Sequence, residues 1–446
     1  MKEYDVIVLG GGPAGGGVAE QLVKAGKRVA MIEAEAYGGV CPLKGCNPKK
    51  VLMSGAEIRH MAQLMSGNGV PCEVDIDWPK LMAFKRTFVD PVPKRARAAY
   101  EKMGVETLIG YGRFVDPHTV EVNGERMTAP NICIGVGHKV RDLPVEGCEQ
   151  LPCSDDFLEL EEMPASVVFI GGGYVAFEMA HIARRAGAEV TLLNRSMQVL
   201  REFDPDLTCD LVGASTEAGI DVKLNSPIDH VERSGSGYRI CFGQDGECLI
   251  EADMVFNCTG RVPWLDGLGL DAAGVEFDKS GVLVNERMQS VSAPHIYAMG
   301  DVASEGAALT PVATIQANAA AANILDPDSA EVNYKGIPSA CFTLPPLAKA
   351  GLTVRQAEEA GHDFTVKENK LAEAFPWKRL GETFGRSRVL VDEKNDRILG
   401  AHILGHNAEE MINVFALAIR QDIPLSQVRD TVWAYPTCGY YIKYMI

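Results

Sequence analysis

The sequence predicts an α/β protein in which one strand–turn–helix unit occurs twice. The first copy has an apolar strand at 4–9, a glycine turn at 10–15 and a helix at 18–25. The second has a strand at 166–170 and a glycine turn at 171–176, again followed by a helical stretch. A chain of 446 residues is far longer than one core supports, so we expect several domains around these units.

Composition and charge restrict the kind of protein. Hydrophobic residues make up 46% of the chain and charged residues 23%, with 45 glycines, which is typical of a globular α/β protein. A formal net charge of -17 disfavours nucleic acid or an anionic membrane as a partner. The start of the chain lacks the basic and apolar run of an export signal, and no long uncharged apolar stretch follows. We therefore expect a cytoplasmic protein without a membrane segment.

The first glycine turn has the GxGxxG spacing of a dinucleotide-binding loop. Gly10 permits the turn, Gly12 lets the backbone approach a pyrophosphate, and Gly15 completes the pattern. The amino end of the following helix then faces the negative charge of the phosphates. The next strand, 29–32, ends at Glu33, whose carboxylate is placed to accept hydrogen bonds from ribose hydroxyls.

The second glycine turn, with Gly171 and Gly173, predicts a second dinucleotide site. The strand after it ends at Asn194 and Arg195 rather than at an acid, and Arg201 follows six residues later. A neutral residue with two guanidinium groups suits the 2′-phosphate of NADP better than the free ribose hydroxyls of NAD. The pattern favours NADPH over NADH, although Arg201 is alternatively a solvated surface arginine.

Two more strand ends fit a nucleotide enclosed by distant parts of the chain. One strand closes in Gly260, and another closes in Gly300 and Asp301. Asp301 is placed for a cofactor hydroxyl, or alternatively caps a helix or turn. The segment 309–313, which includes Val312, begins a helix at a proline, so its free N–H groups would point at an anion or a carbonyl.

Cys41 and Cys46 follow the first fingerprint at the distance where a flavin ring would lie. In a regular helix their Cα atoms would be about 7.5 Å apart, beyond the roughly 4.4–6.8 Å usual for a disulfide. The glycines and prolines around them, Gly39 among these, allow the distortion that a redox disulfide needs. Two unpaired cysteines in a loop are the alternative. Lys44 between them is either a cation that favours the Cys41 thiolate or a solvated surface lysine.

These segments together resemble the FAD-dependent pyridine nucleotide-disulfide oxidoreductases, which include glutathione reductase, dihydrolipoamide dehydrogenase and mercuric reductase. The resemblance covers nearly the whole chain and rests on both fingerprints, the cysteine pair and the segments 258–261 and 297–301. It implies two Rossmann-like domains and a carboxy-terminal α+β domain that forms a homodimer. The implied domains are an FAD-binding domain in two parts, 1–148 and 266–333, an NAD(P)-binding domain at 149–265, and a dimerisation domain at 334–446.

The resemblance also implies roles for individual residues. Cys41 matches the thiol that attacks the substrate, and Cys46 matches the thiol beside the flavin. Lys49 matches a lysine near the flavin, Glu178 its ion-pair partner, and Tyr174 the ring that covers the nicotinamide pocket. A cation at Lys49 would also lower the pKa of a nearby thiol. Electrons would pass from NADPH, or less favourably NADH, through FAD to the Cys41–Cys46 disulfide.

The resemblance fails at the carboxy terminus. Disulfide reductases of the family carry His-Pro-Thr-x-x-Glu there, whereas this chain has Tyr435 and Tyr440 at the histidine and glutamate positions. Tyrosine is a poor base at neutral pH. We therefore expect a small disulfide or thiol-bound acceptor with an easily leaving thiol, hydrogen-bonded by these tyrosines. Cys438 is either a third thiol that relays electrons or binds a soft metal, or a packing residue in a dimer contact.

Two other functions remain open at this stage. Mercuric reductases also have a tyrosine in place of the histidine, so metal reduction is one alternative, although their paired terminal cysteines are absent. The other alternative is a redox sensor or electron carrier that never turns over a small substrate. We expect no resident metal site.

Overall fold

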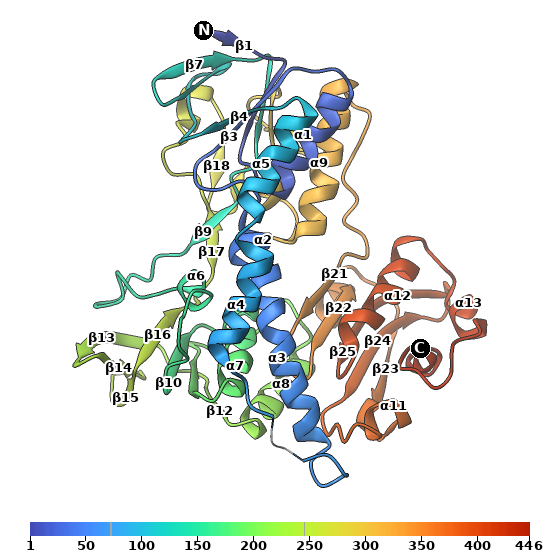
Figure 1. The fold of residues 1–446 in the computed structure, drawn as a ribbon. Helices are drawn as coiled ribbons and strands as arrows, with labels where there is room; N and C mark the ends of the chain where they lie inside the picture. Colours follow the sequence, from blue (N-terminus) through green and yellow to red (C-terminus); the bar gives the residue numbers. More distant parts are fainter. Residues whose placement is uncertain (72–73, 245) are drawn as a thin grey trace. The chain divides into compact units, whose positions relative to one another are not determined.

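The computed structural model describes residues 1–71, 74–244 and 246–446. The chain forms two compact units, each assembled from separate parts of the sequence, whose course can be followed in Figure 1. The first unit contains Met1–Pro48, Lys85–Arg141 and Arg261–Tyr334. The second contains Lys49–Phe84, Asp142–Gly260 and Lys335–Ile446.

A parallel sheet in the order β20-β8-β2-β3-β4 forms the centre of the first unit. Strand β2 is buried along its whole length, as parallel strands usually are. Helices α1 and α9 lie side by side (Figure 1). A smaller sheet has the order β1-β7-β6-β5.

The elements of the first unit are β1 (Lys2–Glu3), β2 (Val6–Leu9), α1 (Pro13–Lys24), β3 (Val29–Glu33), α2 (Val40–Lys44), α5 (Val92–Met103), β4 (Glu106–Ile109), β5 (Arg113–Asp116), β6 (Thr119–Val122), β7 (Glu125–Thr128), β8 (Asn131–Ile134), β9 (His138–Val140), β17 (Arg261–Pro263), η1 (Leu270–Ala273), β18 (Phe277–Asp278), β19 (Gly281–Val282), β20 (Ile296–Ala298), η2 (Gly300–Val302) and α9 (Thr310–Leu325). Helices α3 (Cys46–Leu64) and α4 (Trp78–Val89) have residues in both units.

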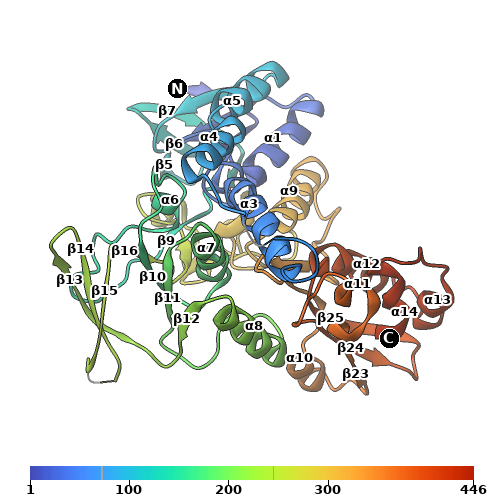
Figure 2. The same ribbon diagram turned by 60° about the horizontal axis from the view of Figure 1, so that its bottom comes forward.

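The second unit contains a parallel sheet in the order β12-β11-β10-β16 and an antiparallel sheet in the order β21-β22-β25-β24-β23. Helix α12 packs along the antiparallel sheet, as Figure 2 shows. A small antiparallel sheet, β13-β14-β15, adjoins the parallel one. Two parallel sheets behind glycine turns and a final antiparallel sheet confirm the predicted fold class; the exact division into four domain segments stays a prediction.

The elements of the second unit are α6 (Ser154–Phe157), β10 (Ser166–Ile170), α7 (Tyr174–Arg185), β11 (Glu189–Leu193), α8 (Pro205–Glu217), β12 (Ile220–Lys223), β13 (Ile228–Ser234), β14 (Gly237–Phe242), β15 (Cys248–Ala252), β16 (Met254–Asn257), β21 (Pro338–Cys341), β22 (Leu347–Gly351), α10 (Val354–Glu359), β23 (Thr365–Lys370), η3 (Leu371–Glu373), α11 (Phe375–Lys378), β24 (Arg386–Asp392), β25 (Arg397–Leu404), α12 (Ala408–Arg420), α13 (Leu425–Asp430), η4 (Gly439–Tyr441) and α14 (Ile442–Met445).

The first helix begins five residues earlier than the sequence pattern predicts. Its amino-terminal cap is Gly12, and a proline occupies the first turn. The glycines that follow hide the helical pattern, but each makes room for a neighbour: a Cβ on Gly15 would lie 1.9 Å from the carbonyl oxygen of Gly10. A Cβ on Gly16 would lie 2.2 Å from the hydroxyl of Tyr100. Close packing therefore explains glycine in a helix where propensity disfavours it.

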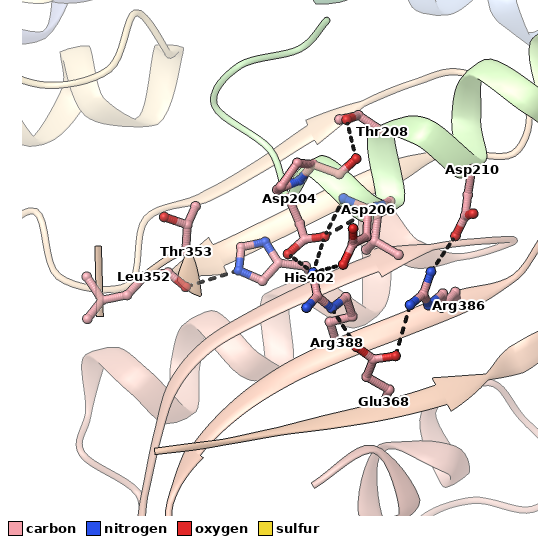
Figure 3. A network of polar contacts seen from close by, with 12 residues as sticks. Asp204, Asp206, Thr208, Asp210, Leu352, Thr353, Glu368, Arg386, Arg388 and His402 are labelled. Carbon is pink, nitrogen blue, oxygen red and sulfur yellow. Dashed lines mark hydrogen bonds and ion pairs between the residues drawn. The ribbon is translucent and has the colours of Figure 1, made fainter. Parts of the chain in front are cut away.

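A partly buried ion-pair network joins α8 to the final antiparallel sheet (Figure 3). Asp204 caps α8, accepting from two backbone amides, and both of its carboxylate oxygens also accept from Nη1 of Arg388 at 2.8 and 2.7 Å. The Nε of Arg388 donates to Glu368, which also accepts from Arg386. Arg386 in turn reaches Asp210 on α8. These pairs link the parallel-sheet region to the antiparallel sheet within one unit.

Candidate active site

The first glycine turn lies where three strands of the parallel sheet end. Gly10 has a φ of +105°, and a Cβ there would lie 2.3 Å from the carbonyl oxygen of Gly135. Gly12 caps α1 and Gly15 packs on the turn. Glu33, at the end of β3, accepts from the amide of Gly11 at 2.7 Å. Gly10 and Gly15 therefore leave no space for a side chain, as expected for the glycine turn of a dinucleotide-binding loop.

The redox segment is attached to this turn by its backbone. The amide of Gly38 donates to the carbonyl oxygen of Gly11 at 3.0 Å. Gly39 has a φ of +74°, and a Cβ there would lie 2.6 Å from the Cα of Gly12. These contacts hold the start of α2, which carries Cys41, against the glycine fingerprint.

The helix breaks between the two cysteines, as expected for a pair too far apart in a regular helix. Helix α2 ends at Lys44, Gly45 is not helical, and α3 begins at Cys46. The Cys41 thiol forms a hydrogen bond with Cys46. The disulfide itself stays a prediction, because both residues are thiols in this structure.

Besides Cys46, the Cys41 thiol has a polar partner that the sequence does not reveal, the Thr310 side chain. Its hydrogen bond with Cys46 and its burial raise its pKa, whereas a hydrogen bond with the Thr310 side chain acts in the opposite direction. Thr310 is the first residue of α9, and a hydroxyl at a predicted helix start was the only available signal. Lys44 is partly exposed, and its Nζ lies 2.8 Å from Oε2 of Glu35. The carboxylate of Glu35 therefore offsets the charge of Lys44.

Asp301 lies in the first unit, at the end of the sheet that carries Gly10. Burial raises its pKa, and the nearby His138 and Arg261 oppose that shift. His138 Nδ1 is 3.9 Å from Asp301 Oδ2 and was not predicted as a site residue. Gly300 precedes the acid with a φ of +72°, and Val312 is buried in the first turn of α9. These residues bring a carboxylate and a helix start to the strand ends.

Glu178 occupies a buried site in the second unit with two cations. Its Oε2 lies 2.7 Å from Nζ of both Lys49 and Lys50, and its Oε1 accepts from the amide of Phe342 at 3.0 Å. Burial opposes its ionisation, but the two ammonium groups hold its pKa below the usual value. The structure thus contains the predicted Lys49–Glu178 pair. Lys50 was missed, although it directly follows Lys49 in the sequence.

The two lysines differ in their surroundings. Lys49 is buried and lies 4.9 Å from the ring centre of Tyr174; burial opposes its charge, but Glu178 raises its pKa. Lys50 lies 3.8 Å from the ring centre of Phe342, and burial lowers its pKa. The Glu178 carboxylate therefore forms ion pairs with a buried lysine and with a second, more accessible lysine.

The second glycine turn repeats the geometry of the first. Gly171 has a φ of +133°, and a Cβ there would lie 2.3 Å from the carbonyl oxygen of Cys258. Gly173 caps α7 and has open space where its side chain would be. Tyr174 follows as the exposed first residue of α7, and Gly260 has a φ of +124°. A crowded first glycine and an open third glycine are what a dinucleotide-binding turn is expected to have.

The loop after β11 separates the three residues predicted to read the ribose. Asn194 is buried, and its amide donates to the carbonyl oxygens of Ser196 and Gln198 at 2.7 and 3.1 Å. Its side chain therefore shapes the loop. Arg195 and Arg201 are exposed, and Arg201 donates to the Ser196 hydroxyl at 3.2 Å. Ser196 was not predicted, and only its place between the arginines could have indicated it.

The carboxy-terminal tyrosines form a partly exposed cluster with a lysine. The rings of Tyr435 and Tyr440 pack edge to face, 4.9 Å apart. The hydroxyls of Tyr440 and Tyr444 are 3.5 Å apart, and Lys443 Nζ lies 4.1 Å from the ring centre of Tyr440. The hydrogen bond with Tyr444 and the nearby ammonium lower the pKa of Tyr440. Lys443 and Tyr444 were not predicted as site residues.

Cys438 lies in the core of the final antiparallel domain rather than beside these rings. Its sulfur accepts from the side-chain amide of Asn407 at 3.6 Å, and burial raises its pKa. This is the environment of a packing residue; the relay role stays a prediction.

Among the described residues, no group of three or more metal-ligating side chains converges. Within residues 1–71, 74–244 and 246–446, no helix is long and apolar enough to cross a membrane.

Two dinucleotide folds, a cysteine pair on the first glycine turn and a final antiparallel domain define a flavoprotein oxidoreductase architecture. Family models agree: residues 4–317 match "Pyridine nucleotide-disulphide oxidoreductase", and residues 337–446 match its dimerisation domain. The chain belongs to this family, whose members depend on FAD and use pyridine nucleotides. It is an oxidoreductase that acts on sulfur groups.

Named relatives span nearly the whole chain. A mercuric reductase of Bacillus cereus is 32% identical over 99% of this chain and 70% of its own length. A glutathione reductase of Nostoc sp. is 31% identical, covering 98% of this chain and 97% of the relative. The HOCl-induced flavoprotein disulfide reductase RclA from Escherichia coli, solved as a Cu(II) complex, superposes with a TM-score of 0.89 at 26% identity, covering 100% of this chain and 99% of that one.

Proposed function

We propose that this protein is a homodimeric, cytoplasmic NADPH-dependent disulfide oxidoreductase that reduces a small disulfide or thiol-bound acceptor with Cys41 and Cys46. The attachment of the cysteine segment to the first fingerprint carries this proposal. Gly38 bonds to Gly11, and Gly39 packs on Gly12. A pair of thiols held at a dinucleotide loop suits electron transfer from a cofactor bound there, as family membership implies.

The chain's own residues account for the thiol chemistry. FAD, when bound, supplies the transfer of two electrons between nicotinamide and the cysteine pair. Cys41 then attacks one sulfur of the acceptor disulfide: a mixed disulfide forms, and the other sulfur leaves as a thiolate. Cys46 attacks the Cys41 sulfur, which releases the second thiolate and restores the Cys41–Cys46 disulfide. Because the pKa of Cys41 is raised, attack needs its proton removed, and an acceptor with a low leaving-thiol pKa favours the first step.

Side chains around both nucleotide sites support the assignment of the cofactors. Glu33 and Asp301 are the carboxylates available to FAD hydroxyls in the first unit. Arg195 and Arg201 are the exposed guanidinium groups after β11, and Arg201 is oriented by Ser196. Guanidinium groups recognise phosphate with directed hydrogen bonds, which favours NADPH over NADH.

Reduction of a metal ion is the second candidate function. Its support is the similarity to a mercuric reductase and to a flavoprotein disulfide reductase solved with Cu(II), together with Tyr435 at the position of the family histidine. A soft metal substrate held by the thiolates of Cys41 and Cys46 needs no proton from a histidine. Buried Cys438 gives no support for a third accessible thiol.

An anaerobic titration with NADPH, and separately with NADH, tests the proposal. The protein as purified with its flavin is compared with Cys46→Ser and with Cys209→Ser, an exposed cysteine on α8 that serves as the control. We expect NADPH to produce a long-wavelength thiolate-to-flavin band in wild type and in the control, but not in Cys46→Ser. Direct bleaching of the flavin without this band in wild type would contradict a role for the cysteine pair.

Turnover with a panel of acceptors separates the two functions. An aromatic disulfide with a low leaving-thiol pKa, glutathione disulfide, Hg(II) and Cu(II) are supplied in turn with NADPH. The disulfide assignment predicts the fastest turnover with the aromatic disulfide. Faster oxidation of NADPH with either metal ion than with any disulfide would favour metal reduction.

A further inference from the structure

One face of helix α7 carries three buried polar side chains. Glu178, His181 and Arg185 are spaced by three and four residues, so they lie along one ridge of the helix. Glu178 belongs to the ion pair with the lysines, whereas His181 has no role in the thiol chemistry. A fully buried histidine beside that ion pair needs a physical reason.

Hydrogen bonds determine which nitrogen of His181 carries the proton. Nε2 lies 3.0 Å from the hydroxyl of Ser215, which donates to the carbonyl oxygen of Leu211 at 2.7 Å, so Nε2–H must be the donor. Nδ1 is therefore an acceptor, and it accepts from the amide of Leu344 at 3.3 Å and from Arg185 Nη1 at 3.0 Å. Burial and Arg185 hold the pKa of His181 well below its usual value, so the ring stays neutral.

The same ridge holds the segment that follows β21. The amide of Phe342 donates to Glu178 Oε1 at 3.0 Å, and the amide of Leu344 donates to His181. Amides two residues apart can point to one side, as they do in an extended chain. The ring of Phe342 also covers the ammonium of Lys50. Two acceptors on α7 therefore hold the segment whose Phe342 ring covers the Lys50 ammonium.

We infer that His181 is a positioning residue for the Glu178 ion pair, acting through the segment Phe342–Leu344. By accepting the Leu344 amide, it keeps the Phe342 amide on Oε1 of Glu178 and leaves Oε2 to the lysines. It also keeps the Phe342 ring over Lys50. This inference deepens the proposed function and rests on it, because the family resemblance behind that function implies a role for the Lys49–Glu178 pair.

Two substitutions at His181 separate its two hydrogen-bonding ends. The side-chain oxygen in His181→Asn lies near the position of Nδ1 and retains the acceptor for Leu344. The side-chain amide in His181→Gln reaches Ser215 in place of Nε2 but offers no acceptor to Leu344. Both variants are compared with wild type as purified with FAD.

Two readouts follow the tether and the ion pair. Hydrogen exchange by mass spectrometry reports the Phe342 and Leu344 amides, and we expect about tenfold faster exchange in His181→Gln and wild-type exchange in His181→Asn. Competitive acetylation across a pH series reports the ammonium of Lys50. Because burial is the main cause of its lowered pKa, loosening the Phe342 ring should raise the labelling midpoint by about half a pH unit in His181→Gln only.

Unchanged amide exchange in His181→Gln would overturn the inference. Faster exchange with an unmoved midpoint would also overturn it, since His181 would then hold the segment without acting on the ion pair. If His181→Gln does not fold, His181→Phe replaces it: the ring keeps its volume but has no acceptor for the Leu344 amide, and both shifts should appear in the same direction. Their absence there would overturn the inference as well. Neither readout depends on turnover, so a wild type that reduces no disulfide contradicts the proposed function alone.

Discussion

At the scale of single residues, Glu178 is a fully buried carboxylate that pairs with two lysines. One buried carboxylate accepts from Lys49, Lys50 and the amide of Phe342, so both of its oxygens have partners. Removing one member of a buried ion pair usually costs about 3–5 kcal/mol, because the remaining charge has no partner. Replacement of Glu178 would leave two cations without a counter-charge, so substitution there tests stability as much as catalysis.

From the proposed function, we expect the two exposed arginines after β11 to select NADPH over NADH. We expect Arg201→Ala to raise the KM for NADPH about tenfold, the effect of losing a charged hydrogen bond of about 1.5 kcal/mol, and to leave the KM for NADH unchanged. Arg195→Ala should act in the same direction. Steady-state kinetics with both nucleotides measure the effect, with Arg239→Ala as the surface control. Equal changes for both nucleotides would contradict recognition of the 2′-phosphate.

The raised pKa of Glu382 predicts that the free energy of unfolding depends on pH. Burial raises its pKa from 4.5 to about 7, although its carboxylate accepts from the amide of His406. The folded state then holds a proton that the unfolded chain has already lost, so stability falls as the pH rises from about 4.5 to about 7, by up to about 3 kcal/mol. Glu382→Gln should remove this dependence and be more stable than wild type at pH 8.

Urea unfolding at pH 5 and pH 8 measures this difference. The exposed Glu410 supplies the control variant Glu410→Gln, which should keep the wild-type dependence. A wild-type stability that rises over the same pH interval, or an unchanged slope in Glu382→Gln, would show that another group dominates.

At the scale of elements, the start of α8 depends on one carboxylate. Asp204 caps the helix and pairs with Arg388 of β24 while almost fully buried (Figure 3). We expect Asp204→Ala to lower the free energy of unfolding by about 3 kcal/mol or more, because both the cap and the partner of a buried cation are lost. Asp206→Asn removes a more exposed partner of the same arginine and should cost less than about 1 kcal/mol.

Urea midpoints of the two variants measure this difference, and hydrogen exchange in α8 and β24 locates it. Equal losses in both variants would mean that net charge, rather than the buried pair, stabilises this connection. The same helix carries the exposed Cys209, so Cys209→Ser reports any general sensitivity of α8 to substitution.

At the scale of the whole molecule, the carboxy-terminal region exposes apolar side chains. Val432 is 97% exposed and Tyr435 is 65% exposed, within the part that matches the family's dimerisation domain. Large exposed apolar side chains that are close together in the chain are candidates for a protein interface. They support a homodimer in which these residues meet the second subunit.

We expect wild type to sediment at twice the mass of the chain and Val432→Asp to sediment as a monomer, because an unpaired carboxylate is costly in a buried interface. Analytical ultracentrifugation measures the change, and Leu249→Asp, an exposed leucine of β15, is the control. Retained FAD with lost disulfide turnover in the Val432→Asp monomer would show that both subunits are needed. A dimer that survives Val432→Asp would place the interface elsewhere.

The repeated parts of this protein follow from local sequence. Strand β10 has the predicted bounds, and the glycine turns follow the strands as expected, since buried parallel strands and GxGxxG turns depend mainly on local sequence. The need for a break between Cys41 and Cys46 also followed from helix geometry. The start of α1 could not be predicted, because Gly15 and Gly16 are there for neighbours distant in the sequence.

The surroundings of each site residue depend on how distant segments of the chain pack together. This packing brings Lys50 to Glu178, Thr310 to Cys41 and His181 to Leu344, contacts that join residues far apart in the chain. Cys438 lies in a hydrophobic core, and the side-chain amide of Asn194 donates a hydrogen bond within its own loop. Residue type and spacing report what a side chain can do. Burial and hydrogen-bond partners, which set its pKa and orientation, depend on packing between segments and become fixed only when the chain folds.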